Sequence, residues 1–207
     1  MKRTLVVGGL LLAIATAASA QTKGRFVVEQ AGTQVATEEF TRTATSVTGV
    51  IAMLNGVRIT FDMTLAADAS APRLHAEVFA PTDTTTAAST LDARFSRDSL
   101  IGEVNTAGTK TPVAAKVPAG TVPYVNPSAV FMEQIIRRAK KIGGTDVNVF
   151  VTALGGSEPY IEVPVSFASA DEARMNLGGV ELIFKIDGEG AIQSGSVPSQ
   201  NLTITRK

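Results

Sequence analysis

The sequence contains no cysteine and no tryptophan, and it has one histidine, His75, and two tyrosines. The absence of cysteine excludes disulfides, thiolate metal ligands, a cysteine nucleophile and a lipid-modified cysteine. A single histidine excludes a site with several histidine ligands in one subunit, and a Ser-His-Asp triad would have to use His75. The few aromatic residues argue against a carbohydrate-stacking surface and an aromatic-girdled outer-membrane barrel. We therefore expect no metal, no cofactor and no enzymatic activity.

Residues 1–20 have the pattern of a secretory signal peptide. A positive pair, Lys2 and Arg3, precedes an apolar stretch at 5–17, and Ala18-Ser19-Ala20 matches an A-x-A cleavage site. The alternative, an uncleaved membrane anchor, would need about 20 continuous apolar residues, whereas this stretch is shorter and is interrupted by glycine and threonine. We therefore expect cleavage after Ala20 and export to the periplasm or the extracellular space, with no integral membrane segment left after processing.

The mature part, residues 21–207, has the size and charge of one ordinary globular domain. A chain of this length buries roughly 70% of its unfolded surface, so it needs no disulfide or metal for stability. The whole sequence holds 19 basic and 19 acidic side chains, so it offers no broad positive field to a phosphate backbone. We predict a single domain and do not expect nucleic acid as a partner.

Alternation of apolar and polar residues with a period of two dominates the mature chain and is typical of half-buried strands. The clearest case is 57–65, where every second residue from Val57 is apolar, as an antiparallel sheet with one wet face requires. The same pattern predicts strands at 25–30, 34–43, 47–54, 57–65, 73–79, 90–95, 99–104, 147–154, 160–167, 173–177, 180–187, 191–197 and 202–206.

Two short motifs predict hairpin turns. Asn55-Gly56 lies between the strands at 47–54 and 57–65, and because both residues readily take positive φ, we expect a tight type I′ turn there. Asp187-Gly188 predicts a second hairpin turn. Asp187 and Glu189 resemble paired carboxylates for glycoside or metal chemistry, but the glycines beside them explain the run as a turn.

Residues 105–126 contain prolines and glycines that remove ladder donors or favour turns. We therefore expect a long irregular connection there, which would divide the predicted strands into two groups, each with enough strands for one sheet. Pro164 lies within the strand predicted at 160–167, so this strand should be at a sheet edge or carry a bulge.

The sequence predicts one helix, at about 127–142. Asn126 would be its N-cap, Pro127 would take the first helical position, and Gly143-Gly144 would end it. Basic residues crowd the last turns, where the helix dipole favours cations. We interpret the segment as a core-covering helix with a solvated basic end; docking on a membrane surface or a partner is the alternative. Its apolar stripe consists of Phe131, Met132, Ile135, Ile136, Ala139 and Ile142.

The order of the elements runs from the leader through a β-meander, one amphipathic helix and a second β-meander to Asp187-Gly188-Glu189-Gly190-Ala191-Ile192 and a last strand ending at Arg206. This order resembles small exported bacterial β proteins of unknown function, which are similar to the half-barrel lipoprotein carriers LolA and LolB. The resemblance is one of pattern and assigns no functional residue. An antiparallel sheet of ten or more strands tends to curl, and one apolar helix can fill its concave side. We therefore predict a mainly β fold, with an antiparallel curved sheet or incomplete barrel wrapped around the helix.

Such a fold favours non-catalytic binding of an apolar ligand, for example a lipid or an acyl chain, between the sheet and the helix. The candidate ligand-binding residues are Met53, Met63, Phe131, Met132 and Ile135, since methionine gives a pocket pliable walls. The alternative for the methionines is that they fill the core. An interaction or structural module of the cell envelope, docking an envelope protein, is the second function that we consider.

His75 is the candidate for catalysis. It shares a strand face with Arg73 and Glu77, so Glu77 could orient the imidazole as an acid or base in a hydrolase or an isomerase. However, no serine stands in a G-x-S-x-G motif to act as a nucleophile, and the polar face of a one-sided sheet is ordinarily solvated. We therefore interpret His75 as a surface residue and keep the enzyme as an alternative.

Overall fold

The computed structural model describes residues 21–153, 156 and 158–207. The predicted signal peptide, residues 1–20, lies outside the described residues, as does Leu154 at the end of one predicted strand. The described residues form one 15-stranded sheet, one α-helix, α1 (Ala129–Ile142), and a short 3-10 turn, η1 (Pro198–Gln200). The strands are β1 (Thr22–Gln30), β2 (Thr33–Arg42), β3 (Ser46–Met53), β4 (Arg58–Thr64), β5 (Arg73–Phe79), β6 (Ser89–Phe95), β7 (Ser99–Thr106), β8 (Thr109–Lys116), β9 (Val122–Tyr124), β10 (Asp146–Ala153), β11 (Ile161–Ser169), β12 (Glu172–Leu177), β13 (Val180–Ile186), β14 (Ile192–Val197) and β15 (Leu202–Arg206).

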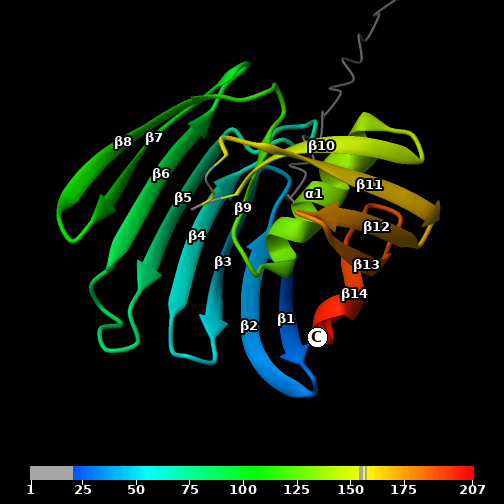
Figure 1. The fold of residues 1–207 in the computed structure, drawn as a ribbon, viewed down its shortest axis with the longest axis horizontal. Helices are drawn as coiled ribbons and strands as arrows, with labels where there is room; N and C mark the ends of the chain where they lie inside the picture. Colours follow the sequence, from blue (N-terminus) through cyan, green and yellow to red (C-terminus); the bar gives the residue numbers. More distant parts are fainter. Residues whose placement is uncertain (1–20, 154–155, 157) are drawn as a thin grey trace, which may run out of the picture.

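The sheet is open and strongly curled. Its order runs from β8 back to β1, continues from β1 to β15, and then runs back from β15 to β9. Neighbouring strands are antiparallel, except for the parallel pair β9 and β10. Figure 1 shows β1 to β8 as a broad curved wall and β10 to β14 curling around α1. The mainly β fold with a curved sheet wrapped around one helix is therefore confirmed.

The predicted irregular connection at 105–126, and the division into two sheets, are wrong. This segment holds β8 and β9, which are the two edges of the one continuous sheet. Pro112 lies on β8 and Pro123 on β9. Because an edge strand pairs on one side only, it tolerates the missing N–H of proline. The prolines thus mark the edges of the sheet rather than a break in it.

The strand that contains Pro164, β11, is an inner strand with β10 and β12 on its two sides. Its bulge lies between Phe167 and Ser169 and not at the proline. Pro164 pairs with Asn148 of β10 and stands next to Val165, where the pairing with β12 ends. The sheet therefore accommodates this proline because the hydrogen-bonded pairing of β11 with β12 stops at Val165. The predicted bulge is present in the strand, whereas the predicted edge position is wrong.

Both predicted hairpins are present. The turn between β3 and β4 is not of type I′, because Gly56 has a φ of 84° whereas Asn55 does not have a positive φ. Instead, the side-chain oxygen of Asn55 accepts the N–H of Val57 at 3.1 Å. The Asp187 carboxylate likewise accepts two N–H groups of its own loop between β13 and β14, which agrees with its interpretation as a turn residue.

The helix begins later than predicted. Ser128, and not Asn126, is the N-cap of α1, because its hydroxyl oxygen accepts the N–H of Phe131 at 3.4 Å. Pro127 therefore precedes the helix instead of starting it. Serine and asparagine are both favoured at N-caps, so the local sequence did not distinguish between the two positions.

A buried acid from the sheet, Glu38 on β2, completes the cap. Its carboxylate accepts the hydroxyl of Ser128 at 2.9 Å and the N–H groups of Ala129 and Val130 at 2.7 and 3.0 Å. Burial raises the pKa of Glu38 to about 7, and the negative charge of Glu133 also raises it. The three hydrogen bonds lower this pKa, but their effect is smaller than that of burial. The contact joins the start of α1 to β2, near the middle of the 15-stranded sheet.

A second buried acid, Glu133, fixes the rotation of α1. Its carboxylate lies 3.2 Å from Nε of Arg42 on β2 and 3.0 Å from Nη1 of Arg206 on β15. It also accepts the N–H of Ile192 on β14 at 3.0 Å. Buried acids need such partners, since an uncompensated buried charge is strongly destabilising.

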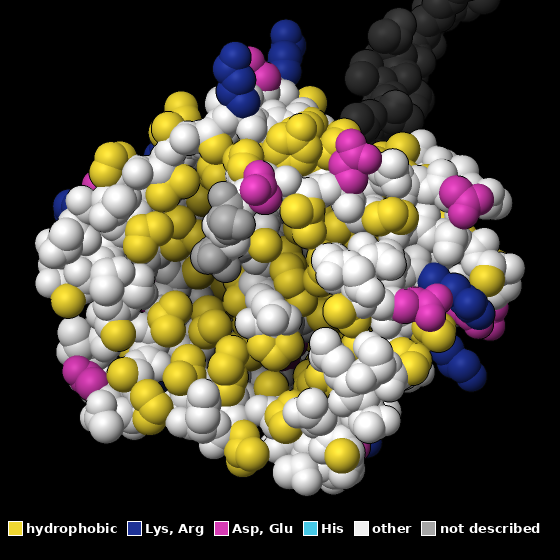
Figure 2. Space-filling model, viewed as in Figure 1, with side chains coloured by type: hydrophobic (Ala, Val, Ile, Leu, Met, Phe, Trp, Pro, Cys, Tyr) yellow, Lys and Arg dark blue, Asp and Glu magenta, His cyan; other side chains and the backbone are white. Residues whose placement is uncertain are grey.

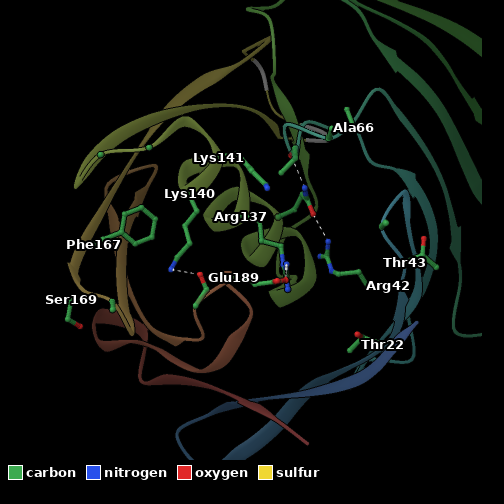
Figure 3. A pocket seen from close by; sticks show the side chains of 18 residues that line it. Thr22, Arg42, Thr43, Ala66, Arg137, Lys140, Lys141, Phe167, Ser169 and Glu189 are labelled. Carbon is green, nitrogen blue, oxygen red and sulfur yellow. Dashed lines mark hydrogen bonds and ion pairs between the residues drawn. The ribbon is translucent and has the colours of Figure 1, made fainter. Parts of the chain in front are cut away.

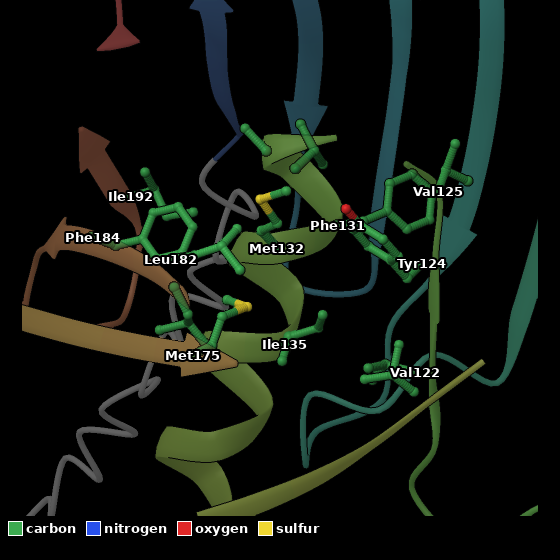
Figure 4. Packing of buried hydrophobic residues seen from close by; sticks show 14 of the residues in the cluster. Val122, Tyr124, Val125, Phe131, Met132, Ile135, Met175, Leu182, Phe184 and Ile192 are labelled. Carbon is green, nitrogen blue, oxygen red and sulfur yellow. The ribbon is translucent and has the colours of Figure 1, made fainter. Parts of the chain in front are cut away.

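The apolar stripe of α1 faces the core, as Figure 4 shows. Phe131, Ile135 and Ile136 are fully buried, and the ring of Phe131 meets that of Phe61 on β4 edge-on with centroids 5.0 Å apart. The prediction is wrong for Ile142, which is 48% exposed. It is the last residue of the helix and lies beyond the turns that the sheet covers.

Candidate ligand-binding site

The concave face of β5 to β8, which α1 does not cover, forms an open apolar trough. Its cavity volume is about 890 Å³. Figure 2 shows hydrophobic side chains gathered over this hollow in the molecular surface. The opposite side of the trough is formed by Val125 and Asn126, which lead from β9 to α1, and by residues at the end of β10.

The trough is hollow because small residues form its floor. Ala76, Ala93, Gly102 and Ala115, one from each of β5 to β8, line it. A Cβ atom at Gly102 would collide with the main chain of Asp92 on β6. Close approach of β6 and β7 therefore requires glycine at this position, and the missing side chain widens the hollow.

Larger apolar side chains form the walls. Val78, Leu91 and Val113 line the trough and are only partly buried, so part of their apolar surface faces solvent. Leu100 belongs to a small separate cluster with Ala93 at the base. The apolar lining and a volume within the range of small-molecule pockets make the trough a candidate ligand site.

Polar side chains also line the trough. Asn126, Thr152 and Glu158 lie on the side that leads to α1, and Ser89 and Thr90 lie on β6. The side-chain oxygen of Asn126 accepts the hydroxyl of Tyr124 at 3.0 Å, and burial raises the pKa of Tyr124, so this hydroxyl stays a donor. The Thr152 hydroxyl donates to the carbonyl oxygen of Pro159 at 2.9 Å. The site therefore combines an apolar floor with several polar groups.

None of the five predicted ligand-binding residues lines the trough. Met63, Phe131 and Ile135 are fully buried in the core around α1, and Met53 packs against that core. Met132 lines a smaller apolar cavity of about 300 Å³ between the start of α1 and β13 to β15. The trough residues were not predicted as a group; the signal that could have found them is the alanine or glycine at inward positions of four adjacent strands.

His75 lies on the convex face of β5, opposite Leu74. Its Nδ1 is 3.0 Å from Oδ1 of Asp92, and its Nε2 is 3.7 Å from Oε1 of Glu77. Asp92, which sequence reasoning did not connect with His75, is thus the nearer acid, because β6 places it directly opposite. His75 lines neither the trough nor the cavities beside α1.

Two further observations concern the described residues alone. Within 21–153, 156 and 158–207, no group of three or more histidine, aspartate or glutamate side chains is placed to hold a metal ion. No helix in these ranges combines the length and the apolar character needed to cross a membrane.

Comparison with known proteins identifies relatives in fold. No family model and no curated protein matches this chain. A DUF1089 family protein from Pseudomonas aeruginosa is similar in structure, with a TM-score of 0.54, 12% identity and coverage of 96% of this chain and 98% of that one. A β-barrel-like protein of the domain of unknown function DUF1849 from Brucella abortus has a TM-score of 0.50 and 12% identity, and the match covers 90% of this chain and 94% of that one.

At this identity the likeness shows the fold alone. The expected resemblance to β proteins of unknown function is confirmed. The similarity to LolA and LolB stays a prediction.

Proposed function

We propose that this protein is exported and binds an apolar or lipid-like ligand in the trough, without catalysing a reaction. The observation that carries the proposal is the trough itself, an open apolar cavity of about 890 Å³ whose floor is built from small residues. Around the middle of α1, in contrast, the same sheet carries large buried side chains such as Phe26, Phe61 and Phe184. A hollow kept open in this way fits a ligand that replaces the missing side chains.

The arrangement of the lining indicates how the ligand lies. An alkyl chain would run across β5 to β8 over Ala93 and Gly102, and its polar end would lie near Asn126 and Thr152. Glu158 lines the same end, so its carboxylate disfavours an anionic head group there. The best ligand is therefore an acyl or alkyl chain with an uncharged head.

Export is the second part of the proposal, and the pattern at residues 1–20 supports it. It is tested by expressing the full chain in a bacterium and measuring the intact mass of the protein in the periplasmic and culture fractions. We expect a mature chain that begins at Gln21. A full-length chain retained in the cytoplasm would contradict export and leave ligand binding to be judged separately.

Two neighbouring alanines on β8 provide a matched pair of variants for ligand binding. Ala115 lines the trough, whereas Ala114 is exposed on the other face of the strand. With a pyrene-labelled fatty alcohol as probe, fluorescence titration should show binding to the wild type. Ala115→Asp should weaken it about tenfold or more, since burying a carboxylate against an alkyl chain is costly, and Ala114→Asp should bind as the wild type does.

Native mass spectrometry of the protein purified from the cell envelope gives an independent readout. We expect a bound species with the mass of a lipid-like molecule, recovered chemically unchanged. An unliganded protein that also ignores the fluorescent probe would overturn the proposal, as would equal losses in the two alanine variants.

A further inference from the structure

A second large cavity, which we call the basic pocket, lies at the other end of α1. Its volume is about 890 Å³, and it shares no lining residue with the trough. It is formed by the end of β2, the loop between β4 and β5, and the last turns of α1. Figure 3 shows Arg42, Arg137, Lys140 and Lys141 around it, contributed by the sheet and by the helix.

Arg42 is the residue that distinguishes this pocket from an ordinary charged surface. It is only 8% exposed. Its Nη1 donates to the side-chain oxygen of Gln134 at 2.8 Å, and its Nε lies 3.2 Å from Glu133. Its Nη2, in contrast, is buried without a hydrogen-bond partner among the described residues. A buried, charged donor without a partner costs free energy, so an acceptor from outside would stabilise it.

Positive charge around Arg42 exceeds negative charge. Glu133 is contacted by three guanidinium groups, those of Arg42, Arg137 and Arg206, and one carboxylate balances the charge of one of them. The Asp187 carboxylate is already engaged by N–H groups of its own loop. Arg137 also contacts the exposed carboxylate of Glu189, so three guanidinium groups meet two carboxylates and positive charge remains in excess.

The rim of the pocket adds to this surplus. Lys140 and Lys141 line the pocket. The acidic side chain among the lining residues is Glu189, which is 87% exposed and whose carboxylate lies 3.7 Å from the guanidinium of Arg137. Arg138, behind them, is neutralised by Asp68 at 2.9 Å. The basic end of α1 is solvated, as the sequence suggested, but Lys140 and Lys141 also line this open pocket.

We propose that the basic pocket binds a phosphate group, carried either by a small soluble molecule or by a lipid head group. A phosphate monoester carries a charge of about −1.5 to −2 at neutral pH and has three strong acceptor oxygens. It therefore matches the cationic lining of the pocket, which consists of Arg42, Arg137, Lys140 and Lys141. A carboxylate would leave part of the surplus charge unbalanced. The partial negative charge at the helix C-terminus opposes an anion, but it is smaller than these full charges.

The test is a calorimetric titration of the full mature protein with inorganic phosphate, at constant ionic strength set by chloride. We expect saturable binding to the wild type. Lys141→Gln should weaken it about fivefold, as the loss of one partly exposed ion pair does. Lys116→Gln, which removes an exposed lysine on β8 far from the pocket lining, is the matched control and should bind phosphate as the wild type does.

Arg42→Lys keeps the charge but removes the planar fork, and it should weaken phosphate binding about tenfold or more. If this variant does not fold, the double variant Lys140→Gln, Lys141→Gln tests the same site from its rim. Absence of saturable binding to the wild type, or an equal loss in Lys116→Gln, overturns the proposal.

The source of the phosphate is decided by comparing glycerol 3-phosphate with dihexanoyl phosphatidic acid. Tighter binding of the lipid, lost in Lys141→Gln, identifies a head group, and equal binding identifies a soluble phosphomonoester. Ala115→Asp in the trough should leave the titration with inorganic phosphate unchanged, so failure of this proposal and failure of the trough proposal are distinguishable.

Discussion

The two halves of the concave face show how one sheet produces both a core and a site. In the half that holds α1, inward positions carry large side chains such as Phe26, Phe61 and Phe184, which are almost entirely buried. In the trough, the equivalent positions of β5 to β8 carry alanine or glycine, including Ala93 and Gly102. The apolar alternation is the same in both, and side-chain volume decides which half is filled.

The halves also differ in their buried charge. The helix-filled half contains Glu38 and Glu133, which cap and orient α1. The trough has an apolar floor, and Glu158 is the charged side chain among its lining residues. The helix is therefore held in a fixed position by directional contacts, whereas the trough presents a surface that accepts apolar groups without such contacts.

The largest difference between the halves should appear when Phe131 is truncated. Phe131→Ala removes a fully buried ring that packs on Phe61, so it should lower the free energy of unfolding by about 3 to 5 kcal/mol. Leu91→Ala in the trough, where the side chain is partly exposed, should cost about 1 kcal/mol or less. Urea denaturation of the two variants measures both values. If α1 were a movable lid, Phe131→Ala would instead unfold at the wild-type midpoint.

A dependence of stability on pH should arise in the helix-filled half. The pKa of Glu38 is raised to about 7 in the folded protein, from 4.5 in the unfolded chain. Between these values the folded state holds a proton that the unfolded state has lost, so raising the pH through this window destabilises the fold, by up to about 3 kcal/mol. Unfolding free energies between pH 4.5 and 8 should therefore fall more steeply for the wild type than for Glu38→Gln. Parallel curves would contradict the buried position of this carboxylate.

A smaller contrast is expected when the same residue is enlarged in each half. Ala139 is fully buried on α1, so Ala139→Leu overpacks the core and should cost about 1 to 3 kcal/mol. Ala115 faces open space in the trough, so Ala115→Leu should change stability by about 0.5 kcal/mol or less. Thermal unfolding of the two variants compares them directly, and equal costs would mean that the trough is closed in solution.

Much of the fold could be predicted because it depends on local patterns. Period-two alternation located most strands, and β5 and β15 have the predicted bounds. Pro112 and Pro123 were misleading because proline marks both irregular segments and sheet edges, and only the strand order separates the two.

The sites depend on tertiary contacts that the local pattern does not contain. Glu38 and Arg42 share the inward parity of Phe40 on β2, which is a signal of a buried polar network that the sequence analysis did not use. The trough exists because α1 does not cover β5 to β8, and the local sequence pattern does not show which strands the helix covers. Met63 was a candidate because of its residue type, whereas the open space is decided by small residues on other strands.

The most direct test of the contrast between a filled and an open half is to locate a bound chain in a crystal. The mature protein is crystallised with a brominated fatty alcohol, and the bromine is found by its anomalous signal. Our account predicts a peak in the trough, between Leu91 and Val113 on the sheet and Val125 on the facing segment. A peak between α1 and the sheet, or no peak at a saturating concentration of the alcohol, would contradict it.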